Sequence, residues 1–140
     1  MPNHPYLQTI RKYYEGCSKP DVEMMMSTFT PDVTHYFTDN SPVSGAEALA
    51  NYWAGFTTDE RKCLWTVDNF VATDNEAAIE WSMISTFVKE GRKAILRGAE
   101  WYLFRGGKIA EIRAYYFWTE EQQENELVRF PYKERGYPLK

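Results

Sequence analysis

Apolar residues near the start of the chain recur every three or four positions, which is the spacing of an amphipathic helix. This stripe predicts a helix that ends near residues 16–18. Its members are Tyr6, Ile10, Tyr13, Tyr14 and Cys17. A second stripe predicts a short helix, which begins after a capping box of Ser18 and Asp21 and ends before Pro31. Its members are Val22, Met25, Met26 and Phe29.

The next segment predicts one strand and a third helix. Residues 33–38 are rich in β-branched and aromatic side chains, which favour a strand, and residues 39–42 have the composition of a turn. Ser44 and Glu47 have the spacing of a stronger capping box, so we expect the third helix to begin at Ser44. Its buried stripe is Leu49, Tyr52, Trp53 and Phe56.

Four long extended runs follow, over residues 61–73, 75–89, 92–104 and 108–118. Tight turns at residues 74–75, 90–91 and 106–107 separate them, and turns of this length connect hairpins, so the runs predict an antiparallel meander. Such long strands usually contain bulges, and Gly98 is the expected place for one. Thr119 is expected to cap a last short helix over residues 120–127, ahead of a C-terminal tail.

Helices followed by four strands predict an α+β fold, because α/β folds alternate helix and strand. We expect three N-terminal helices to pack on a strongly curved antiparallel sheet, forming a cone with a pocket inside. The length of 140 residues fits one domain over residues 1–140, with residues 119–140 as a C-terminal helix and tail.

Composition adds an aromatic surplus and excludes several classes of protein. Aromatic residues make up 16% of the chain, which favours an aromatic-lined cavity or an interface. The net charge of −4 comes without a basic stripe, so no nucleic-acid partner is expected. No apolar stretch approaches the ~20 residues that span a bilayer, and no signal peptide is recognisable, so no membrane partner is expected. Two cysteines without a CxxC motif predict neither a disulfide framework nor a zinc site, and the cytoplasm is the default location.

Several segments are similar to a known family. They are the paired tyrosines at 13–14, the Pro-Asp helix start at 20–21, and the segments FTPDVT (29–34), PVSG (42–45) and EWYLFRGGKIAEIR (100–113). Over nearly its whole length the chain resembles the nuclear transport factor 2-like superfamily, with its cystatin-like α+β roll, and within it the SnoaL-like branch. The branch is related to polyketide cyclases and ketosteroid isomerases. The resemblance implies this fold and a homodimer through the outer sheet face, but no particular reaction.

The resemblance implies that Glu100 is a catalytic residue. Glu100 falls where ketosteroid isomerases place an oxyanion-stabilising acid and where SnoaL-type cyclases place a catalytic aspartate. Strand alternation then turns Glu100 into the pocket. A carboxyl in an apolar cavity is costly to ionise, which makes it a usable general acid or base. The alternative is a surface glutamate that pairs with Arg97 or Arg113 across the sheet.

Two further residues are candidates for stabilising charge. Tyr13 falls where the isomerase keeps the hydroxyl that donates to the developing oxyanion, and Tyr14 competes for that role. His35, on the inward face of the first strand, could shuttle a proton with Glu100. The alternatives are a core tyrosine and a histidine with a structural hydrogen bond.

A set of inward aromatic residues predicts stacking against a small cyclic or aromatic substrate, although an ordinary aromatic core would explain several of them. The set is Phe37, Trp53, Trp81, Tyr102 and Tyr116. The opposite face carries charges of alternating sign, which predict cross-strand ion pairs on a partner-facing sheet. They are Glu80, Arg97, Glu111 and Arg113. Tyr132 and Arg135 in the tail could close the mouth of the cone, or the tail could simply dock.

Departures from the family patterns disfavour the best-known reactions. Phe37 occupies the position of the isomerase base, and Asp39 lies two residues later, in the expected turn. The middle strands carry neither the Arg-x-Asp pattern of the epoxide hydrolases nor the histidine of the dehydratases. No residue spacing indicates a metal or cofactor site. The chain is therefore expected to be a cofactor-independent acid–base enzyme, an isomerase, cyclase or lyase that includes retro-aldol cleavage. The alternatives are a binding module and a dimerisation domain.

Overall fold

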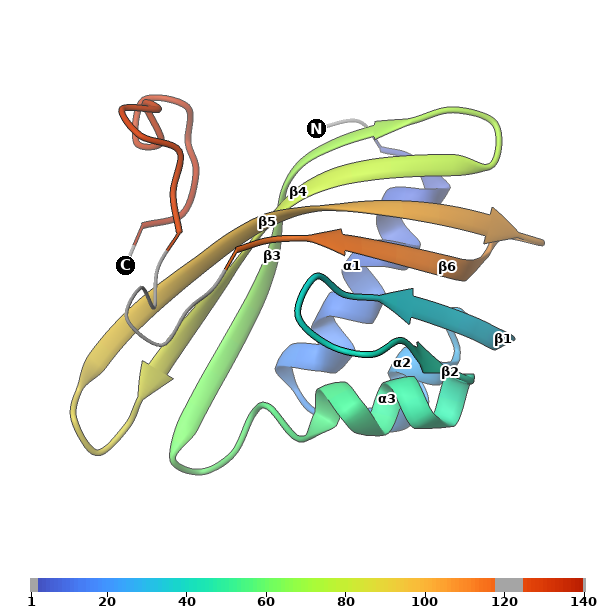
Figure 1. Cartoon of the computed structure of the whole chain (residues 1–140), viewed down its shortest axis with the longest axis horizontal. Helices are drawn as coiled ribbons and strands as arrows, with labels where there is room; N and C mark the ends of the chain where they lie inside the picture. Colours follow the sequence, from blue (N-terminus) through green and yellow to red (C-terminus); the bar gives the residue numbers. More distant parts are fainter. Residues whose placement is uncertain (1–2, 118–124, 140) are drawn as a thin grey trace.

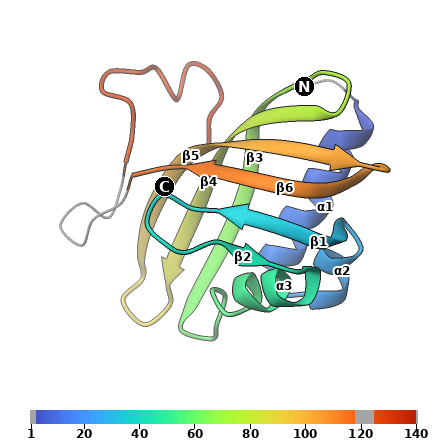
Figure 2. The same cartoon turned by 45° about the vertical axis from the view of Figure 1, so that its right-hand side comes forward.

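The computed structural model describes residues 3–117 and 125–139. In this part of the chain three helices and a six-stranded sheet form the predicted α+β fold, which confirms the fold class. The elements are α1 (Pro5–Ser18), α2 (Val22–Met26), β1 (Phe29–Tyr36), β2 (Val43–Ser44), α3 (Ala46–Ala54), β3 (Arg61–Ala72), β4 (Glu76–Phe87), β5 (Arg92–Arg105) and β6 (Lys108–Tyr115). The helices lie on the concave side of the curved, unclosed sheet (Figure 1; Figure 2).

The sheet has the strand order β2-β1-β6-β5-β4-β3. Strands β3 to β6 form the antiparallel meander that the three turns predict. At the other end the sheet is mixed, because β1 runs parallel to β6 with His35 opposite Ile112. The short strand β2, which the sequence did not predict, pairs antiparallel with β1. Parallel partners are distant in sequence, so no turn signal marks this pairing.

The bulge expected at Gly98 is not there, because Gly98 stays in regular register opposite Trp81 on β4. The register shifts instead between Val67 and Asn69 on β3 and between Leu103 and Phe104 on β5. Gly98 serves close packing: a Cβ at this position would lie 2.6 Å from the ring of Trp81. The glycine therefore lets the indole lie flat against β5.

Both predicted capping boxes are wrong. Ser18, the expected N-cap of α2, is the last residue of α1, and its hydroxyl donates to the Tyr14 carbonyl at 2.9 Å. Asp21 caps α2 by accepting a hydrogen bond from the Met24 backbone N–H at 3.0 Å. The capping box predicted at Ser44 is wrong, because the N-cap of α3 is Gly45, with a φ of 97°, and it makes no side-chain cap. Ser44 is held in β2 opposite Thr34, and the two hydroxyl oxygens are 3.0 Å apart. Strand pairing thus takes the hydroxyl that would have capped the helix.

The C-terminal tail docks on the convex face of the sheet, away from the helices (Figure 1). Arg97 on β5 is its anchor: the guanidinium donates to the Pro138 carbonyl at 2.7 Å and lies 3.4 Å from a Glu126 carboxylate oxygen. The ring of Tyr132 lies 4.0 Å from the same guanidinium. Most of the predicted helix over residues 120–127 lies outside the described residues, and residues 125–127 are not helical. Of the two alternatives for the tail, the structure has the docked one.

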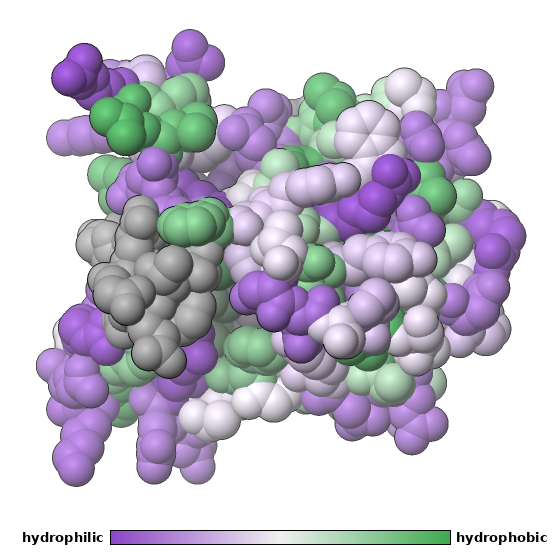
Figure 3. All heavy atoms as spheres, in the orientation of Figure 1, coloured by the Kyte–Doolittle hydropathy of each residue, from purple (hydrophilic) through white to green (hydrophobic). Residues whose placement is uncertain are grey.

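The outer face therefore differs from the prediction. Arg97, expected on a sheet face that contacts a partner, is only 7% exposed because the tail covers it. The expected cross-strand ion pairs do not form in the described part of the chain, where Arg113 pairs with Glu111 on its own strand at 3.1 Å. Beyond the tail, Trp101 and Tyr115 remain exposed. In the tail, Leu127 and Val128 are exposed as well. Figure 3 shows hydrophobic atoms, in green, at the surface of the tail in the upper left of the view. In the described ranges, no helix has the length and hydropathy of a membrane span.

Candidate active site

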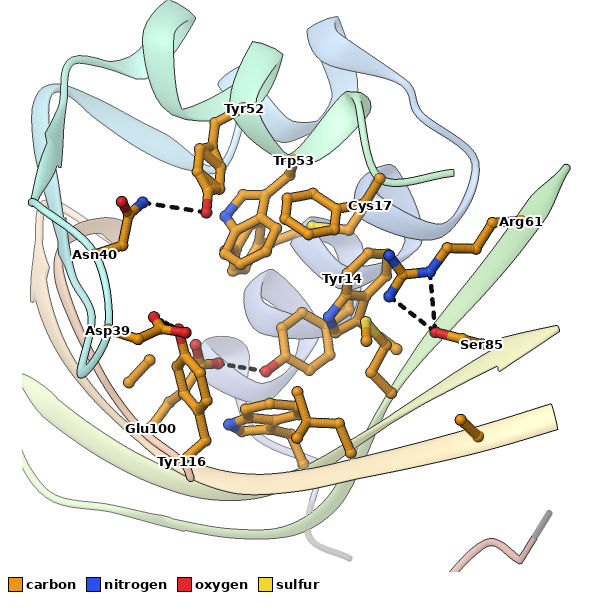
Figure 4. A pocket seen from close by; sticks show the side chains of 18 of the residues that line it. Tyr14, Cys17, Asp39, Asn40, Tyr52, Trp53, Arg61, Ser85, Glu100 and Tyr116 are labelled. Atoms are coloured by element: carbon orange, nitrogen blue, oxygen red, sulfur yellow. Dashed lines mark hydrogen bonds between the residues drawn. The ribbon is translucent and has the colours of Figure 1, made fainter. Parts of the chain in front are cut away.

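A cavity of about 600 Å³ opens on the concave side of the sheet. Helices α1 and α3 cover it, strands β3 to β6 form its wall, and the loop after β1 closes one side (Figure 4). Apolar side chains make up the middle of the wall, including Trp65, Met83 and Leu96. Its polar groups gather at two ends, one around Glu100 and the other around Arg61 (Figure 4).

Glu100 lies on β5, where pairing with Ile79 of β4 and Ala114 of β6 holds its backbone in the centre of the sheet. Its side chain lines the cavity and is 5% exposed. One carboxylate oxygen, Oε1, accepts hydrogen bonds from the hydroxyls of Tyr14 on α1 and Tyr102 on β5, the latter at 2.6 Å. Among the described residues no lysine or arginine pairs with Glu100, so the alternative ion pair with Arg97 or Arg113 does not form there.

The two tyrosines act as hydrogen-bond donors to the carboxylate. Burial raises the pKa of Tyr14 and of Tyr102 well above its usual value, and the negative charge of Glu100 raises both further. The phenols consequently stay protonated at ordinary pH. Hydrogen bonds of this charge-assisted kind are stronger than those between neutral groups.

Tyr13 and Tyr14, the two candidates for one role, face different partners. The Tyr14 hydroxyl donates to Glu100, whereas the Tyr13 hydroxyl bonds to the thiol of Cys17. Tyr13 is nearly fully buried, and burial followed by the Cys17 charge raises its pKa well above the usual value. Both tyrosines line the cavity, but Tyr14 is the one positioned to act with Glu100.

His35 lies in the wall next to Glu100 and does not line the cavity. Its Nε2 atom is 3.4 Å from Oε2 of Glu100, but neither ring nitrogen makes a hydrogen bond within the described part of the chain. The imidazole is fully buried and stacks on Phe37, with the ring centres 4.2 Å apart. A close contact without a formed hydrogen bond means that a small rotation could couple His35 to the carboxylate.

The five predicted substrate-stacking residues separate into two groups. Trp53, Trp81 and Tyr116 line the cavity, whereas Phe37 and Tyr102 lie behind its surface. The indole N–H groups of Trp53 and Trp81 are buried and have no hydrogen-bond partner among the described residues.

Two polar parts of the cavity were not predicted as site residues: Asp39 and Asn40 in the loop after β1, and Arg61 on β3. Tyr116 donates a hydrogen bond to Asp39, and Asn40 donates to the Tyr52 hydroxyl at 3.3 Å. These contacts bring the loop after β1 over the cavity, and no pattern in the sequence indicates where a loop will fold. Arg61 could have been found, because it shares the inward parity of Cys63 and Trp65 on β3.

Arg61 forms the second polar end. Its Nε and one terminal nitrogen donate to the Ser85 hydroxyl at 3.3 and 3.2 Å (Figure 4). Its guanidinium carbon lies 5.6 Å from the centre of the Phe87 ring. Arg92 approaches the same ring to 4.2 Å and pairs with Glu90 at 3.0 Å. Within residues 3–117 and 125–139, no three metal-ligating side chains of the His, Cys, Asp or Glu type gather in one place.

Comparison with known proteins identifies the family. The model of the SnoaL-like domain matches residues 10–112, so the chain belongs to the SnoaL-like family. A solved protein of unknown function with a cystatin-like fold, from Methylobium petroleophilum PM1, is 33% identical. The match covers 97% of this chain and 92% of that one, with a TM-score of 0.69. A sequence search of curated proteins finds no match.

More distant structures share the fold alone. A provisionally assigned polyketide cyclase from Xanthomonas campestris pv. campestris is 18% identical, with 81% of this chain and 90% of the other covered and a TM-score of 0.68. An LEH-like epoxide hydrolase from M. tuberculosis is 10% identical, with 81% and 83% covered and a TM-score of 0.68. The fold thus occurs with more than one chemistry, and the reaction must be argued from the site.

Proposed function

We propose that the protein is a cofactor-independent acid–base enzyme, an isomerase, cyclase or lyase, that acts on a small cyclic or aromatic molecule. The observation that carries the proposal is the setting of Glu100. A carboxylate that is 5% exposed lines a cavity and is held by two neutral phenols instead of a cation. Ionisable groups buried without a countercharge concentrate at functional sites, because their burial costs stability.

In the proposed reaction, Glu100 removes a proton from a carbon next to a carbonyl group of the substrate. The electron pair of the broken C–H bond moves onto the carbonyl oxygen and gives an enolate. Return of the proton to another carbon completes an isomerisation, and attack of the enolate carbon on a second carbonyl closes a ring. The reverse of that attack is a retro-aldol cleavage.

The developing oxyanion needs hydrogen-bond donors, and the site offers them next to Glu100. Tyr14 lines the cavity and stays protonated, so its hydroxyl can turn from Glu100 to the substrate oxygen. The unpartnered indole N–H of Trp81 is a second donor in the same wall. Tyr102 lies behind the surface, where its hydroxyl orients the carboxylate, and His35 lies beside the other carboxylate oxygen as a candidate proton shuttle. Trp53, Trp81 and Tyr116 hold the ring.

Hydrogen exchange on a simple ketone tests this proposal without knowledge of the substrate. The bicyclic ketone 2-tetralone carries acidic protons next to its carbonyl, and proton NMR in D₂O measures their replacement by deuterium. We expect the protein to accelerate exchange and Glu100→Gln to lower the acceleration about 100-fold or more. Equal rates for the wild type and Glu100→Gln, with both folded by circular dichroism, would leave a binding module as the better description.

We also propose that a second copy of the chain covers the outer sheet face beside the tail. Trp101, Arg113 and Tyr36 form one row across β5, β6 and β1, and both aromatic residues are exposed. Light scattering should give a dimer mass for the wild type and for the exposed-turn control Val88→Glu, but a monomer mass for Trp101→Glu. A monomeric wild type would reject the proposal.

The two free, buried cysteines are compatible with the cytoplasmic location that we propose.

A further inference from the structure

The two polar ends of the cavity carry opposite charges. At one end lies Glu100, whose strand position is opposite Ile79 of β4. At the other end Arg61 bonds to Ser85, six residues further along β4, which corresponds to roughly 20 Å of strand. Both side chains extend into the cavity (Figure 4). Apolar side chains fill the wall between them, including Met83 and Leu96.

Arg61 keeps its positive charge uncompensated in the described structure. Four other arginines pair with a carboxylate: Arg92 with Glu90, Arg97 with Glu126, Arg105 with Asp32 and Arg113 with Glu111. The arginines without such a pair in the described residues, Arg11, Arg129 and Arg135, lie outside the cavity lining. Arg61 instead directs two donors at one neutral hydroxyl, and no carboxylate of the described residues pairs with it. The neighbouring rings of Phe56 and Phe87 hold the guanidinium in place. Its remaining N–H groups are therefore available to an acceptor in the cavity.

We propose that the ligand of this cavity is a cyclic carboxylate, and that Arg61 binds its carboxylate group. The ring would then occupy the apolar middle, and the carbon that reacts would lie beside Glu100; only this last point rests on the proposed function. A planar guanidinium fits a planar carboxylate through two parallel hydrogen bonds. Repulsion by Glu100 disfavours the reversed orientation, so the two charged ends together fix the direction of binding.

A carboxylate fits this end better than a phosphate monoester does. A phosphate group carries close to two charges and three acceptor oxygens. Arg92 already pairs with Glu90, so Arg61 supplies the excess charge at this end. Ser85 is 3% exposed and adds one neutral hydroxyl. One excess positive charge matches one carboxylate.

Calorimetric titration with matched probes tests the inference. The probes are 2-naphthylacetate and its neutral amide, 2-naphthylacetamide, which have the same ring and nearly the same size. We expect the wild type to bind the carboxylate about tenfold more tightly than the amide. Arg61→Gln should remove this preference by weakening carboxylate binding about tenfold, while amide binding changes less than about twofold. Arg61→Lys should retain a preference for the carboxylate because it retains the charge.

The controls separate this site from general electrostatics and from catalysis. Arg11→Gln removes an exposed charge on α1, outside the cavity lining, and should leave both affinities unchanged. Glu100→Gln should bind the carboxylate no more weakly than the wild type, even though it loses exchange activity. Equal affinity of the wild type for both probes, an equal loss in Arg11→Gln, or tighter binding of 2-naphthyl phosphate than of the carboxylate would overturn the inference. If binding depended on Arg61 but the protein showed no exchange activity, the inference about Arg61 would be supported and only the proposed reaction would be rejected.

Discussion

Strand β5 carries two buried charged residues, Arg97 and Glu100, on opposite faces of the sheet. Their exposures are similar, 7% for Arg97 and 5% for Glu100, but their partners differ. Arg97 is matched by the Glu126 carboxylate, the Pro138 carbonyl and the Ser82 hydroxyl, which accepts at 2.9 Å. Glu100 is held by the neutral hydroxyls of Tyr14 and Tyr102, with a histidine close by.

The difference distinguishes a structural charge, Arg97, from the charge that we propose to be catalytic, Glu100. Burial of any charge costs several kcal/mol, and a countercharge with good hydrogen bonds offsets much of that cost. Arg97 receives this compensation, and in return it holds the tail on the sheet. Glu100 receives only neutral donors and faces a cavity, so its charge remains available to a ligand.

The largest effect is expected for Arg97→Met. The substitution removes the anchor of the tail and leaves Glu126 without its partner. We expect urea unfolding to show a loss of about 3 kcal/mol. Limited proteolysis should then cleave residues 125–139 first. Arg113→Met, which removes a half-exposed pair on the same face, should cost less than about 1 kcal/mol. Equal losses in the two variants would show that Arg97 is no special anchor.

Gly98→Ala should have the next largest effect on stability. Gly98 lies on β5 between the two charged residues, where there is no room for a side chain. The added methyl group would meet the Trp81 ring at 2.6 Å and the Tyr115 carbonyl at 2.7 Å. We expect a loss of about 2 kcal/mol in thermal unfolding, since such overpacking forces neighbouring atoms to move. Gly55→Ala is the control: its nearest neighbour is the Tyr52 carbonyl at 3.6 Å, and its stability should not fall. If the stability of Gly98→Ala equalled that of the wild type, the close approach of the Trp81 ring to Gly98 would be refuted.

Tyr14→Phe tests the neutral donors of Glu100. Without the Tyr14 hydroxyl, the carboxylate loses a donor and the substrate oxygen loses its nearest partner. We expect the exchange rate of 2-tetralone to fall about tenfold, or about 1.4 kcal/mol. Tyr13→Phe removes a hydroxyl that bonds to Cys17 and should change the rate less than about twofold. A larger effect of Tyr13→Phe would return the donor role to Tyr13, as the family resemblance implies.

The smallest effect concerns the tail at high pH. Tyr137 donates to Glu80 at 2.6 Å, and this hydrogen bond, with burial, raises the pKa of Tyr137 to about 12. A group whose pKa is raised by folding stabilises the folded state below its usual pKa and loses that contribution as pH approaches the raised value. The tail should therefore become easier to cleave between pH 10 and about 12. In Tyr137→Phe the rate of tail cleavage should not rise over this pH range. A rise of the same size in the variant would show that other groups cause it.

Local patterns in the sequence predicted the helices and the hairpins, whereas the inward position of Glu100 was predicted from the family resemblance. Helical spacing and tight turns are determined by neighbouring residues, so each can be found without the rest of the fold. The parallel pairing of β1 with β6 and the burial of Arg97 depend on distant segments. For the same reason, the sequence left the choice between Tyr13 and Tyr14 open. Only the packing of α1 on the sheet decides which hydroxyl reaches Glu100.

The exchange rate of 2-tetralone in D₂O, measured for Glu100→Gln and Arg97→Gln side by side, tests the contrast most directly. Both substitutions remove one buried charge from β5 while keeping a polar side chain. We expect the exchange rate to fall about 100-fold or more in Glu100→Gln, while the tail of this variant stays resistant to protease. Arg97→Gln should release the tail and keep exchange within about threefold of the wild type. If the exchange rate fell equally in both variants, in proportion to their loss of stability, the proposal that Glu100 is catalytic and Arg97 structural would be contradicted.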